Sequence, residues 1–332
     1  MTSVITGVAG FIGSTLADTL LEAGESVIGI DCFTPYYDPA AKRRNLEAAL
    51  SNPAFQLVEG DLCTLDLVDL FSGPDAGGVD VVYHQAGQPG VRLSWSDGFE
   101  EYARLNVVAT QRLLEAAKAA RVPRVVYASS SSLYGNATNY PTTELDLPAP
   151  HSPYGVTKLA AEHLCNLYAA NWGLSTVSLR YFTVYGPRQR PDMAIHRMVE
   201  SALSGSPFPL FGDGSAVRDF TFVGDAVAAN IAAGRADVAP GTVVNIAGGG
   251  DIRVSELIDL VGATTGDPVP VERHEPVAGD VARTGGTIDR AAELLGWTPE
   301  RSIADGVAAQ VAWHRVAGPA AVHREVELPL AG

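Results

Sequence analysis

The sequence predicts an α/β protein, a Rossmann-type doubly wound parallel sheet with a smaller C-terminal lobe attached to it. Short β-branched runs alternate with amphipathic stretches of helical spacing, which is typical of a parallel sheet with helices on both faces. A glycine-rich turn joins the first such run to the first helix. After Tyr181 the alternation gives way to loops rich in proline and glycine, which indicates a second unit. We assign residues 1–182 and 219–249 to the sheet domain and residues 183–218 and 250–332 to the lobe.

The strands and helices are expected in a regular order along the chain. β-branched runs predict strands over residues 3–6, 26–30, 55–60, 79–84, 124–129, 175–180 and 243–248. Helical spacing and glycine stops predict helices over residues 11–24, 99–120, 153–173, 254–266 and 303–315. Ser152 and Pro153 mark the start of the third helix, because serine caps free N–H groups and proline suits the first helical position. The final residues, "REVELPLAG", are expected to form a loose tail.

Composition and charge exclude some classes of function. The chain has 332 residues, 46% of them hydrophobic, and a formal net charge of −15, so a general attraction to nucleic acid or to an anionic membrane is not expected. Because we find no basic leader and no apolar run of membrane-spanning length, we expect a cytoplasmic location. Cys32, Cys63 and Cys165 are odd in number and lack C-x-x-C spacing. They predict buried thiols, with neither a disulfide framework nor a metal site.

The turn "VITGVAGFIG" is typical of a dinucleotide site. Gly7, Gly10 and Gly13 let the backbone approach a pyrophosphate. The pyrophosphate would then lie at the helix N-terminus that begins with Phe11 and Ile12, where backbone N–H groups have no partner.

The ends of the following strands supply further candidates for the cofactor. Asp31 ends the second strand at the spacing of an acidic residue that binds ribose hydroxyls and repels a 2′-phosphate, so NAD is favoured over NADP. Asp61 ends the third strand, where we expect it to meet the adenine. The fourth strand runs into "HQAGQPG", a second glycine-rich crossing near the cofactor, in which His84 is expected to be packed rather than catalytic. The other residues of these two segments assigned to the cofactor are Leu62, Gln85, Ala86 and Gly87.

The stretch "SPYGVTK" sets Tyr154 and Lys158 four residues apart, on one face of a helix. Only three of the 23 lysine and arginine residues are lysines, which disfavours a lysine placed here merely as surface charge. A free tyrosine, with a pKa of about 10, is a poor base at neutral pH, and a nearby ammonium or the positive nicotinamide would lower that pKa. We therefore expect Lys158 to tune Tyr154 and to hold the nicotinamide ribose.

A run of serines, "SSSSLYG", follows the fifth strand, at the sheet edge where open α/β proteins bind ligands. One of these hydroxyls is expected to share a hydrogen bond with Tyr154 and with a substrate hydroxyl. That the serines only shape the turn stays open at this point.

Together, "GVAGFIG", Asp31, "SSSSLYG", "SPYGVTK" and "RDFTFVGDAV" resemble the extended short-chain dehydrogenase/reductase family, in its nucleotide-sugar epimerase branch, over nearly the whole chain. Within it, "DCFTPYYDPAAKRRNL", "GQPGVRLSW" and "RYFTVYGPRQRPDM" are most similar to UDP-glucuronate 4-epimerases. The resemblance implies oxidation at C4 by a tightly bound NAD, turning of the 4-keto sugar, and return of the hydride to its other face. It also implies that Ser130 is the catalytic serine beside Tyr154 and Lys158, and that Tyr181 lies at the cofactor.

The same resemblance implies where the nucleotide sugar binds. Thr183 would bond a carboxylate at C6, Arg188 and Arg190 would lie on a loop that closes over the nucleotide, and Arg218 would grip the diphosphate or uridine. The remaining residues assigned to the substrate are Tyr154, Pro89, Gly90, Arg92, Ser130, Ser131, Ser132, Asp280 and Arg283. Relatives often carry an arginine directly after "GDV", whereas this chain has Ala282 there and its arginine one place later, a departure that bears on the diphosphate contact.

Alternatives to UDP-glucuronate epimerisation remain open. Ser131 and Ser132 stand where 4,6-dehydratases of the family carry an Asp-Glu pair and where glucuronate decarboxylases carry a glutamate at the second place, so neutral hydroxyls favour epimerisation. The rivals are a UDP-glucose/UDP-galactose-type 4-epimerase, a decarboxylase or dehydratase of the same family, and an NAD-binding sensor or scaffold, which the intact Ser/Tyr/Lys set disfavours. Helices over 98–120 and 153–171 resemble those of a four-helix dimer interface, so a homodimer is expected.

Overall fold

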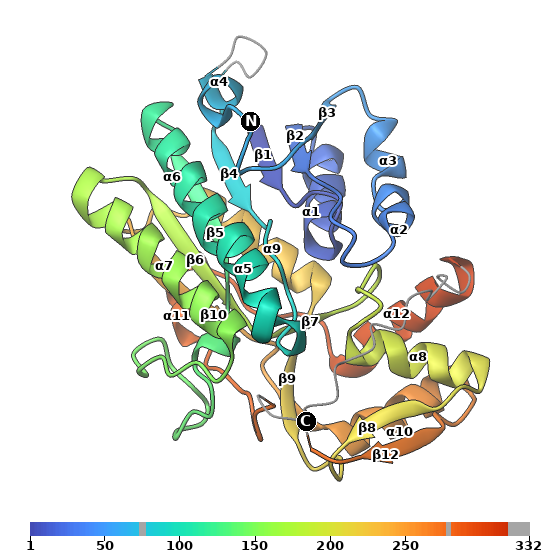
Figure 1. The fold of residues 1–332 in the computed structure, drawn as a ribbon. Coiled ribbons are helices and arrows are strands. Elements are labelled where there is room, and N and C mark those ends of the chain that lie inside the picture. The colour runs from blue at the N-terminus through green and yellow to red at the C-terminus, as the bar shows by residue number, and fades with distance from the viewer. Residues whose placement is uncertain (73–77, 277–279, 318–332) are drawn as a thin grey trace.

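The computed structural model describes residues 1–72, 78–276 and 280–317, and the segment expected to form a loose tail lies outside them. A seven-stranded sheet forms the centre of the larger domain, in the order β10-β6-β5-β4-β1-β2-β3 (Figure 1). All neighbouring strands are parallel. The strands are β1 (Thr2–Thr6), β2 (Ser26–Asp31), β3 (Phe55–Glu59), β4 (Val81–His84), β5 (Arg124–Ser130), β6 (Thr176–Tyr181) and β10 (Thr242–Ile246). The predicted doubly wound sheet is confirmed.

Helices cover both faces of this sheet and bury an apolar core against each face. The helices of one face are α1 (Phe11–Glu22), α9 (Val223–Arg235) and α11 (Asp289–Leu295), and those of the other face are α4 (Leu67–Ser72), α6 (Ala109–Ala119) and α7 (Pro153–Trp172). The short helices α2 (Pro39–Arg44) and α3 (Glu47–Leu50) connect β2 to β3. Because both faces are covered, the central strands are buried on both sides, which explains their nearly continuous apolar sequence.

The strand order reverses between β1 and β4. The turn after β4 is fixed against the end of β1, because Gln85 N donates to Thr6 O (3.2 Å) and Ala86 N donates to Thr6 Oγ1 (3.2 Å). Connections leave β1 and β4 on opposite sides here, which opens a crevice at the carboxyl edge of the sheet. Open α/β sheets bind their ligands at such a reversal.

The smaller lobe has an apolar core of its own. Its helices and paired strands are α8 (Ala194–Ser204), α10 (Val254–Thr265), α12 (Ile303–Ala317), β8 (Phe208–Phe211) and β12 (Val271–His274) (Figure 1). A three-stranded sheet of β7 (Thr183–Tyr185), β9 (Val217–Phe222) and β11 (Asp251–Arg253) lies beside them. None of the helices in the described residues combines the length and apolar character that a membrane crossing requires.

The helix expected over residues 99–120 is interrupted. α5 (Phe99–Tyr102) leads into a π-helical turn (Ala103–Val108) before α6 begins. Asn106 in this turn is buried, and its side chain accepts from Gln88 N (2.6 Å) and donates to Gln88 O (3.1 Å) and to Thr157 Oγ1 (3.0 Å). These partners are distant in sequence, so helical periodicity alone did not predict the irregular turn.

The cysteine prediction was wrong for two of the three residues. Cys165 is buried, but Cys32 is exposed and Cys63 is half-buried. Cys32 follows directly after the end of β2, and Cys63 lies in the turn after β3. Both residues therefore lie outside the sheet, where the flanking helices do not fully cover their side chains.

A buried ion pair attaches α7 to the sheet. Both carboxylate oxygens of Glu162 accept from the Arg180 guanidinium, with Nη2–Oε1 at 2.7 Å and Nε–Oε2 at 3.0 Å. Ser129 Oγ on β5 donates to the same carboxylate (2.6 Å), and Arg180 on β6 donates from Nη1 to the Tyr134 hydroxyl (2.6 Å). Since the side chains of Glu162 and Arg180 are 1% and 6% exposed, each depends on the other for neutralisation.

Glu162→Gln should destabilise the protein by about 3 kcal/mol, because it leaves the buried Arg180 charge uncompensated. The matched control is Glu59→Gln, which removes the carboxylate from a surface pair with Arg43, 54% exposed on both sides. That change should cost less than about 1 kcal/mol. Urea unfolding of the two variants measures both values, and equal losses would contradict the role assigned to Glu162.

Candidate active site

A cavity opens at the carboxyl edge of the sheet, where the strand order reverses. Every residue that the sequence assigned to the cofactor lines this one cavity. They are Gly7, Gly10, Phe11, Ile12, Gly13, Asp31, Asp61, Leu62, Gln85, Ala86, Gly87, Tyr154, Lys158 and Tyr181. The loops after four strands and the first turns of α1 and α7 therefore meet around one space.

The glycine-rich turn has no room for side chains. Gly7 has φ +69°, and a Cβ there would lie 2.8 Å from the backbone of Ala86. A Cβ on Gly13 would lie 2.2 Å from the Gly7 carbonyl oxygen, so α1 can start this close to β1 only with glycine. Gly10 gives α1 no side-chain cap, and the first turn of α1 holds no acidic residue. Its N–H groups thus form a cradle that fits a pyrophosphate.

Asp31 is held in one orientation by backbone donors. Its Oδ2 accepts from Ala9 N (3.0 Å) and its Oδ1 from Phe33 N (2.8 Å), and each oxygen keeps a second lone pair for a hydroxyl. Asp61 accepts from Cys63 N (2.8 Å) and forms an ion pair with Arg104 (2.5 Å). A carboxylate at the end of β2 and an anion cradle on α1 suit the ribose and the pyrophosphate of NAD.

Tyr154 lies in the cavity at the start of α7. Burial raises the pKa of Tyr154, while a hydrogen bond with Ser130 and the positive charge of Arg190 lower it in part. The structure thus pairs Tyr154 with the serine that the resemblance implied. Burial outweighs these two effects, so the pKa of Tyr154 stays above its usual value. Lys158 is not among the groups that shift this pKa, and its tuning of Tyr154 stays a prediction.

Lys158 is buried one turn after Tyr154. Its Nζ lies 4.4 Å from the centroid of the Tyr127 ring. Burial lowers the pKa of Lys158 to about 8, and the nearby Glu162 carboxyl opposes that shift. Lys158 is therefore mainly a cation at neutral pH, and it lines the cavity together with Lys42 and Arg190.

The segment after β2 contributes cavity residues that the sequence analysis did not assign to the site. These residues are Cys32, Thr34, Tyr36, Tyr37 and Lys42. Lys42 is buried, and its Nζ donates to Thr34 O (2.8 Å) and Thr34 Oγ1 (3.0 Å). The scarcity of lysine could have indicated Lys42 as a site residue, since two of the chain's three lysines line this cavity.

A loop of the lobe closes one side of the cavity. Arg190 lines it and forms a two-bond ion pair with Asp192, at 3.0 Å for each bond. The guanidinium lies 5.9 Å from the Tyr36 ring, and the Tyr36 hydroxyl donates to Asp192 (3.3 Å). Tyr102 packs edge-on against Tyr154, with ring centroids 6.2 Å apart. Arg190 is thus the arginine whose charge reaches the Tyr154 phenol.

The other residues assigned to the substrate lie on several different elements. Pro89 lines the cavity, while Arg188 forms an ion pair with Asp18 of α1 (2.7 Å). Gly90 stands so close to Tyr36 that a Cβ would lie 2.4 Å from its hydroxyl. Ser132 N donates to Ser130 Oγ (3.1 Å), so this turn also orients the Ser130 hydroxyl. Ser131 begins the short helical turn after β5, and Thr183 begins β7.

A second group lies where β9 meets the segment around residue 282. Arg92 forms an ion pair with Asp280 (3.3 Å), and Arg218 Nη1 donates to Ala282 O (3.3 Å). Burial lowers the pKa of Arg218, and Asp280 opposes this shift. Arg283 pairs with Asp251 (2.5 Å). The structure brings these four substrate candidates together apart from the cofactor cradle.

His84 is packed, as predicted. Its ring nitrogens bond the Thr6 hydroxyl (2.8 Å) and the Thr110 hydroxyl (2.9 Å), and it is buried. Burial and the neighbouring Lys158 charge lower the pKa of His84 to about 3, so it is neutral at physiological pH.

Comparisons with known proteins agree with this geometry. Residues 3–247 match the NAD dependent epimerase/dehydratase family. The chain is 40% identical to an uncharacterized UDP-glucose epimerase, YtcB, of Bacillus subtilis, over 94% of this chain and 98% of that protein. It is 37% identical to a UDP-glucose 4-epimerase of Mycolicibacterium smegmatis, over 95% and 99%. It also resembles the solved UDP-glucuronic acid 4-epimerase of Bacillus cereus in complex with UDP-glucuronic acid and NAD, at 38% identity, TM-score 0.91, and coverage of 96% and 100%.

Lys158→Met should make the stability of the dinucleotide-free protein less dependent on pH. The pKa of Lys158 is about 8 in the folded protein and 10.5 in the unfolded chain, because burial disfavours the charged amine. Lys158 therefore does not lower the stability of the fold above its unfolded pKa, and that stability is lost as pH falls through about 8. The free energy of unfolding of the variant minus that of wild type should therefore be about 3 kcal/mol higher at neutral pH than in strong alkali. Urea unfolding at neutral pH and at about pH 10 measures this, with Lys118→Met as the baseline for losing any lysine. A difference that is the same at both pH values would contradict the prediction.

Proposed function

The chain belongs to the NAD dependent epimerase/dehydratase family, and from that premise we propose that it is a UDP-glucuronate 4-epimerase that forms UDP-galacturonate. One observation carries the proposal: Tyr154 and Lys158 line the cavity that holds the dinucleotide cradle, and Ser130 lies close enough to Tyr154 to lower its pKa. A proton-transfer group and a hydride acceptor would thus meet at the same sugar carbon. A sensor or scaffold that only binds NAD needs no such arrangement.

The residues of the chain divide the work of the reaction. Bound NAD supplies a hydride acceptor and donor for C4 of the sugar. Tyr154 takes the proton from the 4-hydroxyl and later returns it, and Ser130 holds that hydroxyl by a hydrogen bond. Because burial raises the pKa of Tyr154, the cations at Lys158 and Arg190 have to favour the phenolate when the proton leaves.

The dinucleotide is held by groups already fixed in place. Phe11 and Ile12 would offer backbone N–H groups to the pyrophosphate, Asp31 would accept from a ribose hydroxyl, and Lys158 would hold the nicotinamide ribose. A cofactor that returns its hydride in each cycle need not leave, which agrees with a cavity lined by several loops.

The choice of a uronate over a neutral sugar rests on two features. Ser131 and Ser132 carry no acid or base that would force elimination or loss of the carboxylate. The positive charge of Arg190 acts on Tyr154, so a sugar carboxylate near the phenol would meet a cation. The rival is a 4-epimerase for UDP-glucose, favoured by the names of the two curated relatives described above.

The nucleotide end of the substrate would lie on the lobe, in residues 183–218 and 250–332. Arg218 and Arg283 of the lobe, together with Arg92 of the sheet domain, gather around residues 280–283, where they would bind the diphosphate and uridine. Arg218 is the best placed of the three, because Arg92 and Arg283 already have carboxylate partners. The domains assigned from the sequence thus have separate tasks, cofactor on the sheet and nucleotide on the lobe.

A homodimer and a cytoplasmic location complete the proposal. Large apolar side chains are exposed on α7, on α5 and on the π-helical turn that follows α5. They are Phe99, Val108, Val156, Leu167 and Trp172. Two copies of these helices packed together would cover the apolar surface.

Proton NMR of the purified protein with UDP-glucuronate and no added NAD tests the function. Signals of UDP-galacturonate should appear, because the retained dinucleotide is regenerated in each turnover. Tyr154→Phe should slow this conversion by about 1,000-fold or more while nucleotide binding persists. Tyr168→Phe, on the same helix but outside the cavity, is the matched control.

Other outcomes of the NMR experiment exclude the proposal in distinct ways. A UDP-pentose would mean decarboxylation and would overturn the reading of Ser131 and Ser132. No reaction of UDP-glucuronate together with conversion of UDP-glucose would establish the rival epimerase. Full activity of Tyr154→Phe would remove the tyrosine from the mechanism.

Thr183→Val tests the carboxylate contact assigned by resemblance. Loss of a hydrogen bond to a charged group should lower kcat/KM for UDP-glucuronate by about 10- to 100-fold. The value for UDP-glucose should change little, since that sugar has no carboxylate. Steady-state kinetics with both sugars decides the matter, and equal losses would show that Thr183 does not select the uronate.

A further inference from the structure

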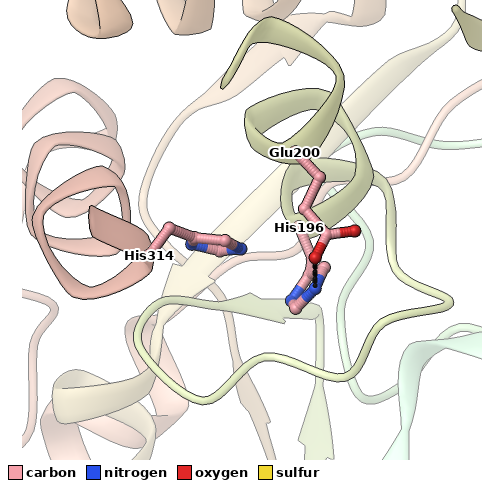
Figure 2. A group of neighbouring side chains, drawn as sticks. All are labelled: His196, Glu200 and His314. Carbon is pink, nitrogen blue, oxygen red and sulfur yellow. Dashed lines mark ion pairs between the residues drawn. The ribbon is translucent and has the colours of Figure 1, made fainter. Parts of the chain in front are cut away.

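Three side chains of the lobe converge in a place remote from the dinucleotide cradle. His196 and Glu200 come from consecutive turns of α8, and His314 comes from α12 (Figure 2). One ligand atom of each residue lies within 4.8 Å of the other two. His196 Nε2 is 3.1 Å from the Glu200 carboxylate oxygen Oε1. Both histidines are buried, and Glu200 is partly buried.

The hydrogen bonds fix which ring nitrogens carry a lone pair. His196 Nδ1 bonds Gln189 O (2.8 Å), and His314 Nδ1 bonds Gln310 O (2.9 Å). A carbonyl oxygen only accepts, so Nδ1 carries the hydrogen in both rings. In the neutral form, each Nε2 then presents a lone pair. Among the described residues, neither Nε2 nor Glu200 Oε1 has a hydrogen-bond partner, although all three atoms are buried.

This arrangement requires a positive centre between the three residues. A neutral imidazole lone pair facing a carboxylate at 3.1 Å is repulsive, and buried polar atoms without partners are costly. We propose that His196, Glu200 and His314 bind a divalent transition-metal ion, with Zn²⁺ as the expected occupant. Two imidazoles and a carboxylate are a donor set that zinc takes, with water in the fourth position.

The geometry agrees with this donor set. Zinc bonds of about 2.0–2.1 Å at tetrahedral angles place ligand atoms about 3.3 Å apart. His196 and Glu200 are already 3.1 Å apart, because residues at i and i+4 share a helix face. Rotation of the His314 side chain would complete the set. Donation of Nδ1–H to a backbone carbonyl is the outer hydrogen bond that metal-bound histidines usually make.

The site would brace the loop that carries Arg190. Gln189 accepts at its carbonyl from His196 Nδ1 and at Oε1 from His196 N (2.9 Å) and Gln310 Nε2 (2.7 Å). Gly186 N donates to Gln310 Oε1 (3.0 Å). An ion between α8 and α12 would therefore hold both helices and, through Gln189, the loop between Gly186 and Arg190. The role is structural and does not depend on the proposed substrate.

The test is Co²⁺ titration of tag-free, EDTA-treated full-length protein, followed by displacement with Zn²⁺. We expect visible absorption bands of low-symmetry Co²⁺ that saturate at one ion per chain and disappear on addition of Zn²⁺. His314→Gln and Glu200→Gln should lose these bands. His163→Gln removes an exposed histidine of α7 and should keep them.

Thermal unfolding with and without Zn²⁺ separates binding from folding. Zn²⁺ should raise the Tm of wild type and of His163→Gln, but not that of Glu200→Gln, which keeps the side-chain shape. If His314→Gln fails to fold, Glu200→Gln alone decides the result. The proposal is overturned if wild type shows no saturable Co²⁺ band, or if both site variants bind as tightly as wild type. The first outcome would mean that a proton on His196 is the positive centre.

Discussion

The position of α7 against the sheet is the constraint on which the active site depends. Tyr154, Lys158 and Glu162 follow one another at intervals of four residues, so all three lie on the face of α7 that meets β5 and β6. The ion pair of Glu162 with Arg180 fixes that face, and the same carboxylate favours the charged form of Lys158. One buried charge therefore serves both the packing of the helix and the state of its catalytic residues.

The parts of the site that the sequence predicted are those made by local chain geometry. The glycine turn needs only a strand, a tight turn and a helix, and the spacing of Tyr154 and Lys158 needs only a helix. What the sequence did not predict depends on contacts made outside regular helix or strand spacing. Lys42 turns inward onto Thr34 at the cavity, and Asn106 reaches both Gln88 and Thr157 from an irregular turn. Neither contact leaves a periodic pattern.

The His196, Glu200 and His314 cluster illustrates the same limit. The spacing of His196 and Glu200 is visible in the sequence, but an isolated pair of this kind is common on helix surfaces. The third residue belongs to another helix, and the decisive facts are the carbonyl partners of the two rings. Cysteine spacing carries no information about a cluster built from histidine and glutamate.

The ion pair between Arg188 and Asp18 joins the substrate loop to α1, the helix whose N-terminus cradles the dinucleotide. The loop that bears Arg190 is thus attached to both domains, by Arg188 to the sheet domain and by Gln189 to the lobe. Rotation of one domain against the other would have to break one of these attachments. The sheet domain and the lobe would consequently hold the sugar and the cofactor in one fixed arrangement, and substrate binding would require little hinge motion between them.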